Sequence, residues 1–442
     1  MYGRAAVLPR LARADAPAPL PAPPEPAPDG GALRFALGIN EAVSVPLKLL
    51  REGHFTPATL GAHLDLDATR TAGLGARFVR GHTGAFPRSS WWASEHDPGA
   101  RDDTDLWVRI VQGHDLEPIV MVSPWPANQT ANYTTTYVPA DMPAYTAWVT
   151  ALVERYDGDG VDDMPGLLRP VRYWEVDNEP DLKFTTPPRD ATRDVPPGSF
   201  CTPEEAATVL IATSTAIRAA SPGARILNGG LYRPFAESGQ AWLKALIAVP
   251  GARAAFDVLS LHAYPSDEHG DAYVRGLAAA RALVPDKPLF VTETSVPSAG
   301  EDRWISPDWQ ARTVAARVAQ GAAYGASVVM WHTLADPPTV ERRGGFARHS
   351  LLTAARDGSV TEKPAAAVFR ALATRLAEDD LVGAQPDGDG AVRLHSGARL
   401  LYEGVRTAPD GGVDLRTGAA VPAGSEAEAP AWLWPPAASA RP

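Results

Sequence analysis

The order of apolar and amphipathic segments is the feature that most constrains the fold of this chain. Short apolar runs rich in β-branched and aromatic residues recur over residues 34–334, and segments of helical periodicity lie between them. This alternation is typical of parallel strands joined by helices. The eight expected strands are residues 34–40, 76–82, 118–123, 171–178, 224–230, 256–264, 287–295 and 326–334.

One helix start is signalled especially well. Thr202 can act as an N-cap, Pro203 suits the first helical position, and Glu205 can complete a capping box. Eight strands with intervening helices over roughly 340 residues have the count and size of a (β/α)8 barrel, so we predict an α/β chain with a closed TIM barrel. The expected helices cover residues 59–75, 104–114, 141–156, 202–220, 306–325 and 363–380.

An open doubly wound sheet is the alternative fold. It requires a glycine-rich phosphate loop after the first strand, which "GINEAVSV" does not supply.

Two terminal segments lie outside the barrel, which is expected over residues 33–382. Residues 1–32 include a Pro/Ala-rich run that cannot pack a core and predicts a disordered segment. Residues 383–442 hold short strands and Gly turns, which indicate a small C-terminal β appendage.

Composition narrows the classes of function. The net charge of −11 argues against a nucleic-acid partner. Cys201 is the only cysteine, which excludes an intrachain disulfide, and no apolar run approaches the ~20 residues of a membrane span. The ten histidines are dispersed, so neither a metal site nor a cofactor is expected. The Pro-rich spacer favours a secreted, periplasmic or cell-surface location over the cytoplasm.

Two glutamates stand at the carboxyl ends of expected strands. Glu179 follows the fourth strand in "DNEP", and Glu293 ends the apolar run of the seventh in "VTET". The carboxyl ends of the strands form the active face of a (β/α)8 barrel, so the two side chains should converge on one mouth. Paired carboxyl groups that flank a bond, one protonated and one ionised, carry out glycoside hydrolysis.

These motifs in this context resemble those of the clan A glycoside hydrolases, which are retaining (β/α)8 enzymes. The segments "WEVDNEPD", "FDVLSLHAY" and "EKPAAAVFRAL" are most similar to family 39 and its neighbours, and the resemblance covers residues 35–380. It implies that Glu179 is the acid/base and Glu293 the nucleophile. Asp177 departs from the pattern, because it stands where Trp is usual.

The resemblance also implies substrate-binding residues at the strand ends. Asn178 would donate to the sugar 2-hydroxyl, or else cap the following turn. Arg80 would hold the nucleophile ionised, or form a structural ion pair. Tyr264 would hydrogen-bond the nucleophile, and Trp331 would form the floor under the sugar, or else belong to the core. Three further residues are expected on the same rim: Asn40, Trp125 and His262.

Two other features have open interpretations. Trp91 and Trp92 could form an outer sugar platform or a local cluster. Arg342, Arg343 and Arg348 follow the eighth strand, and could grip the carboxylate of an acidic glycan or form a solvated loop.

We therefore predict a retaining glycoside hydrolase that cleaves O-glycosidic bonds of an oligo- or polysaccharide by double displacement. A transglycosidase on the same site and a glycan-binding barrel without catalysis are the alternatives. The expected partner is a carbohydrate substrate, and the sequence gives no indication of the sugar or the oligomeric state.

Overall fold

The computed structural model describes most of the chain. The described residues are 34–44, 55–81, 89–96, 99–124, 137–181, 201–232, 234, 236–264, 271–298, 306–336, 348–355, 359–388 and 390–434. Several predictions fall outside these ranges: the N-terminal segment, Trp125, Arg342 and Arg343.

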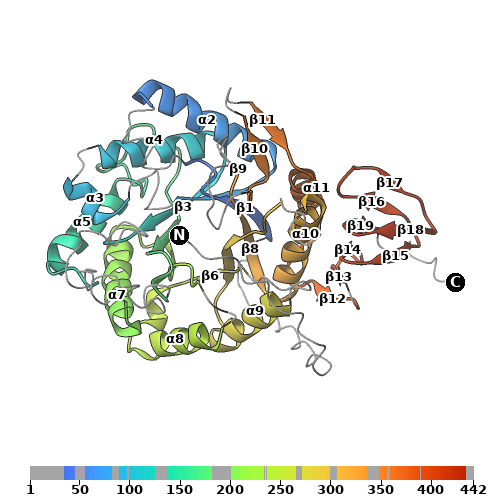
Figure 1. The fold of residues 1–442 in the computed structure, drawn as a ribbon. Coiled ribbons are helices and arrows are strands. Elements are labelled where there is room, and N and C mark those ends of the chain that lie inside the picture. The colour runs from blue at the N-terminus through green and yellow to red at the C-terminus, as the bar shows by residue number, and fades with distance from the viewer. Residues whose placement is uncertain are drawn as a thin grey trace, which may run out of the picture.

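Eight parallel strands form the central sheet, with helices around it (Figure 1). Their order is β5-β4-β3-β2-β1-β8-β7-β6. Parallel bridges from Leu227 to Val258 and from Leu231 to Leu261 join the two ends of this order. The sheet is therefore a closed barrel, as predicted, and not an open doubly wound sheet. The strands are β1 (Ala36–Asn40), β2 (Phe78–Arg80), β3 (Glu117–Val122), β4 (Tyr173–Val176), β5 (Arg225–Leu227), β6 (Leu259–His262), β7 (Leu289–Thr294) and β8 (Ala326–His332).

The helices lie between the strands along the chain. The predicted cap of α7 is confirmed, because Thr202 Oγ1 accepts from the amide of Glu205 and the Glu205 side chain accepts from the amide of Thr202. No helix was predicted from the sequence at the positions of α3, α8 and α9. The helices are α2 (Pro57–Gly73), α3 (Trp91–His96), α4 (Ala100–Gly113), α5 (Met142–Glu154), α7 (Pro203–Ala220), α8 (Glu237–Ala248), α9 (Asp271–Leu283), α10 (Pro307–Ala323) and α11 (Pro364–Glu378). None of the helices in the described parts of the chain combines the length and apolar character of a membrane span.

The core has two layers because successive strand residues point to opposite faces of the sheet. An inner cluster fills the barrel and includes Phe78, Phe290 and Met330. A much larger outer cluster lies between the strands and the helices and includes Val79, Val291 and Val329. Each residue of the second set is a strand neighbour of one in the first. The side of a strand on which a residue falls therefore decides whether it can reach the barrel mouth.

The C-terminal part is a separate β structure packed beside the barrel, as predicted (Figure 1). It consists of a six-stranded sheet and a two-stranded sheet. Ion pairs from Arg312 to Glu428 (2.8 Å) and from Arg416 to Asp308 (3.3 Å) tie it to α10. Its strands are β12 (Gln385–Pro386), β13 (Ala391–Arg393), β14 (Arg399–Leu401), β15 (Val405–Ala408), β16 (Gly412–Asp414), β17 (Ala420–Val421), β18 (Ser425–Glu428) and β19 (Ala431–Leu433).

A small three-stranded sheet lies between β8 and α11 along the chain. It is formed by β9 (Ala335–Asp336), β10 (Leu352–Ala354) and β11 (Val360–Glu362). Arg348, one of the three arginines that could grip an acidic glycan or belong to a solvated loop, is exposed between β9 and β10.

Candidate active site

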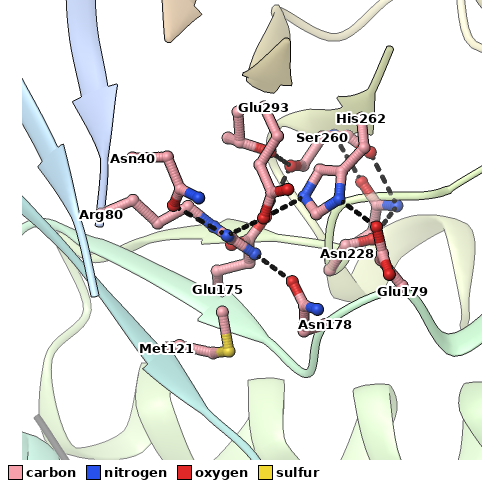
Figure 2. Close-up of polar contacts among 12 residues, drawn as sticks. Asn40, Arg80, Met121, Glu175, Asn178, Glu179, Asn228, Ser260, His262 and Glu293 are labelled. Atoms are coloured by element: carbon pink, nitrogen blue, oxygen red, sulfur yellow. Dashed lines mark hydrogen bonds and ion pairs between the residues drawn. The ribbon is translucent and has the colours of Figure 1, made fainter. Parts of the chain in front are cut away.

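The chain leaves β4 in a strained turn that aims two side chains into the barrel mouth. Asp177 and Glu179 both have positive φ angles, 68° and 50°, which are uncommon for residues other than glycine and cluster at functional sites. The Asp177 carboxylate accepts from Ser123 Oγ (3.1 Å) and from the Tyr137 hydroxyl. With Asp177 tied down behind the turn, Asn178 and Glu179 point toward Arg80 and His262 (Figure 2).

A bulge in β7 turns Glu293 toward the same mouth. Against β6, Leu261 pairs with Val291 but His262 pairs with Glu293, so β7 holds one extra residue, Thr292. A bulge of this kind re-aims the side chains that follow it. Without the bulge, strict alternation after the inward Phe290 would place Glu293 on the outer face.

Arg80 donates hydrogen bonds to four side chains of the site. It is fully buried, and its Nη1 donates to Glu293 Oε1 (2.8 Å) and Asn40 Oδ1 (3.0 Å). Its Nη2 donates to Asn178 Oδ1 (2.7 Å), and its Nε donates to Glu175. Burial alone would lower the pKa of Arg80, but the carboxylates of Glu175 and Glu293 raise it above its ordinary value. The guanidinium is therefore a permanent cation beside Glu293.

His262 bridges the two glutamates. Its Nδ1 lies 2.7 Å from Glu179 Oε1, and its Nε2 lies 3.4 Å from Glu293 Oε1. The ring is fully buried. Burial lowers the pKa of His262, but Glu293 and Glu179 outweigh it, so the net shift is upward. The neighbouring carboxylates thus favour the imidazolium.

Tyr264 and His332 complete the rim around Glu293. The Tyr264 hydroxyl donates to Glu293 Oε2 (2.6 Å), and burial together with the negative charge of Glu293 raises the pKa of Tyr264 well above its ordinary value. The rings of Tyr264 and His332 meet edge to face, with centroids 6.1 Å apart. His332 Nδ1 lies 2.9 Å from Asn40 Nδ2, so the Asn40 side chain connects His332 to Arg80.

The structure contradicts the expected position of Trp331. Its side chain is 2% exposed, belongs to the outer core cluster and donates from Nε1 to the His349 carbonyl (2.8 Å). Val328 and Met330 face the barrel interior, so alternation places His332, not Trp331, toward the mouth. The expectation was one residue out of phase, and such a slip moves a side chain to the other face.

The tryptophan pair after the second strand is also settled in part. Trp91 belongs to the outer core cluster and packs edge to face against Tyr145, with centroids 5.9 Å apart. It is therefore part of a local cluster and not a sugar platform. The side chain of Trp92 lies outside the described residues.

The sequence reasoning missed Glu41 and His332 at the mouth and Glu175 below it. Period-two alternation on β4 and β8 places Glu175 and His332 on the inner face only once the phase of each strand is known. Glu41 has no such signal, because it follows β1 with a φ of 50°. Burial raises the pKa of Glu41, and the charge of His332 lowers it to a smaller extent, so the net shift is upward.

Two groups of side chains among the described residues could hold a metal ion. The first consists of Glu179, His262 and Glu293, whose ligand atoms lie within 4.8 Å of one another. Here Arg80 and Tyr264 already donate to Glu293, which makes a cation redundant. The second group, Glu154, Asp157 and Asp159, lies on the surface away from the mouth.

Residues 94–233 match the family model described as glycoside hydrolase family 44. This stretch runs from α3 past β5 and includes Asn178 and Glu179. A search of the curated proteins found no match.

Solved structures with the same fold cover most of the chain. A glucosidase from Croceicoccus marinus is 16% identical, with a TM-score of 0.52 over 91% of this chain and 82% of that chain. A GH39 β-xylosidase from Caulobacter crescentus is 18% identical, with a TM-score of 0.50 over 87% and 79%. A GH30 endoxylanase from Clostridium papyrosolvens C71 is 13% identical, with a TM-score of 0.53 over 93% and 97%. At such identities these structures show the fold alone.

The family-model match supports a glycoside hydrolase, and the solved structures share the fold of this chain. The chain is thus a glycosidase whose substrate is a carbohydrate. The structure brings seven of the nine predicted site residues together at one mouth: Asn40, Arg80, Asn178, Glu179, His262, Tyr264 and Glu293.

Proposed function

We propose that this glycosidase is a retaining enzyme that cleaves O-glycosidic bonds of an oligo- or polysaccharide, with Glu293 as nucleophile and Glu179 as acid/base. The observation that carries the proposal is the closeness of the two carboxyl groups. One oxygen of Glu179 and one of Glu293 lie within 4.8 Å of each other. Retaining enzymes hold their carboxyl groups about 5–5.5 Å apart, whereas inverting enzymes need roughly 6.5–9.5 Å to admit a water.

The environment of Glu293 suits a nucleophile. Arg80 donates to one of its oxygens and Tyr264 to the other, at 2.8 and 2.6 Å. Donors and a cation favour the ionised form of a carboxyl group. Glu293 therefore attacks the anomeric carbon as a carboxylate, and a covalent glycosyl-enzyme forms.

The environment of Glu179 suits proton transfer. It is 9% exposed and contacts His262 Nδ1 at 2.7 Å, and Glu293 and Glu179 together raise the pKa of His262 above its ordinary value. Glu179 gives a proton to the leaving oxygen in the first step, and in the second step it takes one from the water that releases the sugar.

Asn178 is oriented to contact the sugar. Its Oδ1 accepts from Arg80 Nη2 (2.7 Å), which leaves the Nδ2 amide group free to donate to a substrate hydroxyl. A hydrogen bond to the 2-hydroxyl strengthens as the oxocarbenium-like transition state forms.

The test is hydrolysis of a panel of nitrophenyl glycosides and polysaccharides by the wild type and two variants, Glu293→Ala and Glu179→Ala. We expect no cleavage by the first and partial recovery with azide in the second, because azide can attack the glycosyl-enzyme without a base. Glu378→Ala, which removes an exposed glutamate of α11, is the control and should retain full activity.

Proton NMR of the first-formed product determines the stereochemistry. An inverted anomer would contradict the nucleophile assignment. Absence of cleavage with glycan binding intact in all variants would refute the proposal and favour a glycan-binding barrel. Longer products on addition of acceptor sugars would identify a transglycosidase on the same site.

A further inference from the structure

Glu175 is a fully buried carboxylate for which the proposed reaction gives no role. It lies on β4, four residues before Glu179, and is 0% exposed. Its Oε1 accepts from Ser260 Oγ (2.5 Å), and its Oε2 accepts from Arg80 Nε. Burial of a carboxylate is strongly unfavourable unless it is paired and hydrogen-bonded. Both oxygens are paired here, deep in the barrel and below the mouth (Figure 2).

The contact with Glu175 fixes the direction of the Arg80 guanidinium. This group is planar and carries its N–H donors in a rigid fork. With Nε held by Glu175, the plane of the group is set. Nη1 then reaches Glu293 and Asn40, and Nη2 reaches Asn178.

Glu175 also divides the charge of Arg80. The guanidinium is a single cation that contacts two carboxylates, Glu175 and Glu293, and all three groups are at least nine-tenths buried. In a poorly screened site, a cation paired with one carboxylate alone would hold that carboxylate far more strongly. A nucleophile held too strongly is a weaker base and attacks more slowly.

We propose that Glu175 is a positioning residue that orients Arg80 and takes part of its charge, which keeps the Glu293 carboxylate nucleophilic. This inference rests on the proposed role of Glu293 as nucleophile. Ser260 supports Glu175 in turn, and its hydroxyl also lies 2.8 Å from Thr292 Oγ1 on the bulge that aims Glu293. The buried layer below the mouth therefore sets both the position and the reactivity of Glu293.

Several other charged groups surround Glu293 in the described part of the chain. They come from five strand ends: Glu41 after β1, Arg80 on β2, Glu179 after β4, His262 and Tyr264 at the end of β6, and His332 at the end of β8. A Glu175 variant substitutes none of them. A shift in the acid limb of the pH profile is therefore attributable to Glu175.

The test compares Glu175→Gln with the matched variant Glu117→Gln. Gln keeps the size of Glu175 and can still accept from Arg80 Nε, but it removes the negative charge. Glu117 is also a strand glutamate paired with an arginine, Arg172 (2.8 Å), but it begins β3 at the opposite end of the barrel. Each variant loses one buried carboxylate charge, and only the first loses it next to Arg80.

We expect Glu175→Gln to move the acid limb of the kcat/KM–pH profile to lower pH by about one unit and to lower the plateau about tenfold. The direction follows because loss of a nearby negative charge favours ionisation of Glu293. Glu117→Gln should change neither quantity. An unshifted acid limb in Glu175→Gln, or an equal change in both variants, would overturn the inference.

Two further measurements distinguish failure of the proposed role of Glu175 from a folding defect and from failure of the proposed function. If Glu175→Gln does not fold, Ser260→Ala should give a smaller shift, because it lets the Glu175 side chain move away from its position under Arg80. An unshifted Ser260→Ala variant would then refute the inference. If the wild type cleaves no glycoside, the proposed function fails. The titration of Glu293 in wild type and Glu175→Gln by carbon-13 NMR, which needs no substrate, then decides the inference alone.

Discussion

Gly230 offers the sharpest prediction, because its missing side chain makes room for His262. A Cβ atom added at Gly230 would lie 2.0 Å from His262 Nε2 and 2.2 Å from His262 Cδ2. Non-bonded carbon contacts lie near 3.5–4.0 Å, so in Gly230→Ala the ring must move by more than about 1 Å. The ring is 0% exposed and bound to Glu179 through Nδ1, so it has no free direction in which to turn.

The expected magnitude has two parts. Overpacking of a buried site costs about 1–3 kcal/mol of unfolding free energy. A displacement of about 1 Å in a group that contacts the acid/base costs about 100-fold in kcat. The matched control is Gly223→Ala, where no atom lies within 4 Å of the added Cβ and the φ angle is not positive. That variant should stay within about 1 kcal/mol of the wild type and keep full activity.

Urea unfolding and steady-state kinetics on the best nitrophenyl glycoside measure both quantities. Because the His262 ring has no room to move, we expect Gly230→Ala to lose more activity than its decrease in unfolding free energy alone would explain. Equal stability and activity of Gly230→Ala and Gly223→Ala would refute the reasoning. It would show that His262 moves aside at no cost and that its bridge between the glutamates does not matter.

Three further predictions concern the same mouth. Tyr264→Phe removes a donor to Glu293, so kcat/KM should fall by about 10²-fold and the acid limb of its pH profile should rise; an unchanged limb would contradict this role. Trp331→Phe should lower the unfolding free energy by about 1–3 kcal/mol, through a cavity and the lost hydrogen bond to His349, but leave KM unchanged; a large rise in KM would restore Trp331 to the sugar site. The pKa of His262 is raised in the folded state, so the charged ring adds to the free energy of unfolding. This contribution is fully present below about pH 6.5 and is lost as pH rises through the folded pKa. The difference in unfolding free energy between wild type and His262→Asn, measured by urea titration, should therefore narrow as pH rises, and a constant difference would count against the charged bridge.

Much of the site could be predicted because barrel strands carry their functional residues to one face. Glu179 and Glu293 stand at the ends of apolar runs, and the barrel topology places such ends together. Arg80 and Tyr264 follow the same rule, and both contact Glu293. The strand count and the strand ends predicted that Glu179 and Glu293 meet at one mouth, whereas the expected roles of Arg80 and Tyr264 came from the resemblance to clan A glycoside hydrolases.

Other residues depended on the phase of a strand, which an apolar run alone does not reveal. A strand buried on both faces has no polar side to mark which residues point inward. Trp331 and His332 are neighbours on β8, and either could have faced the mouth until the inward positions of Val328 and Met330 were known. Glu175 was passed over for the same reason. Its pairing with Arg80 also joins residues 95 positions apart, so no local pattern marks it.

The order of strands and helices, the closed barrel and the two glutamates at its mouth could all be predicted from the amino-acid sequence. They follow from local patterns, namely residue periodicity, helix caps and strand ends. The direction in which each glutamate points depends instead on contacts made in the folded chain. The bulge at Thr292 and the left-handed turn from Asp177 to Glu179 break the regular alternation of their strands. Contacts from distant strands hold both irregularities, because no local preference would stabilise them.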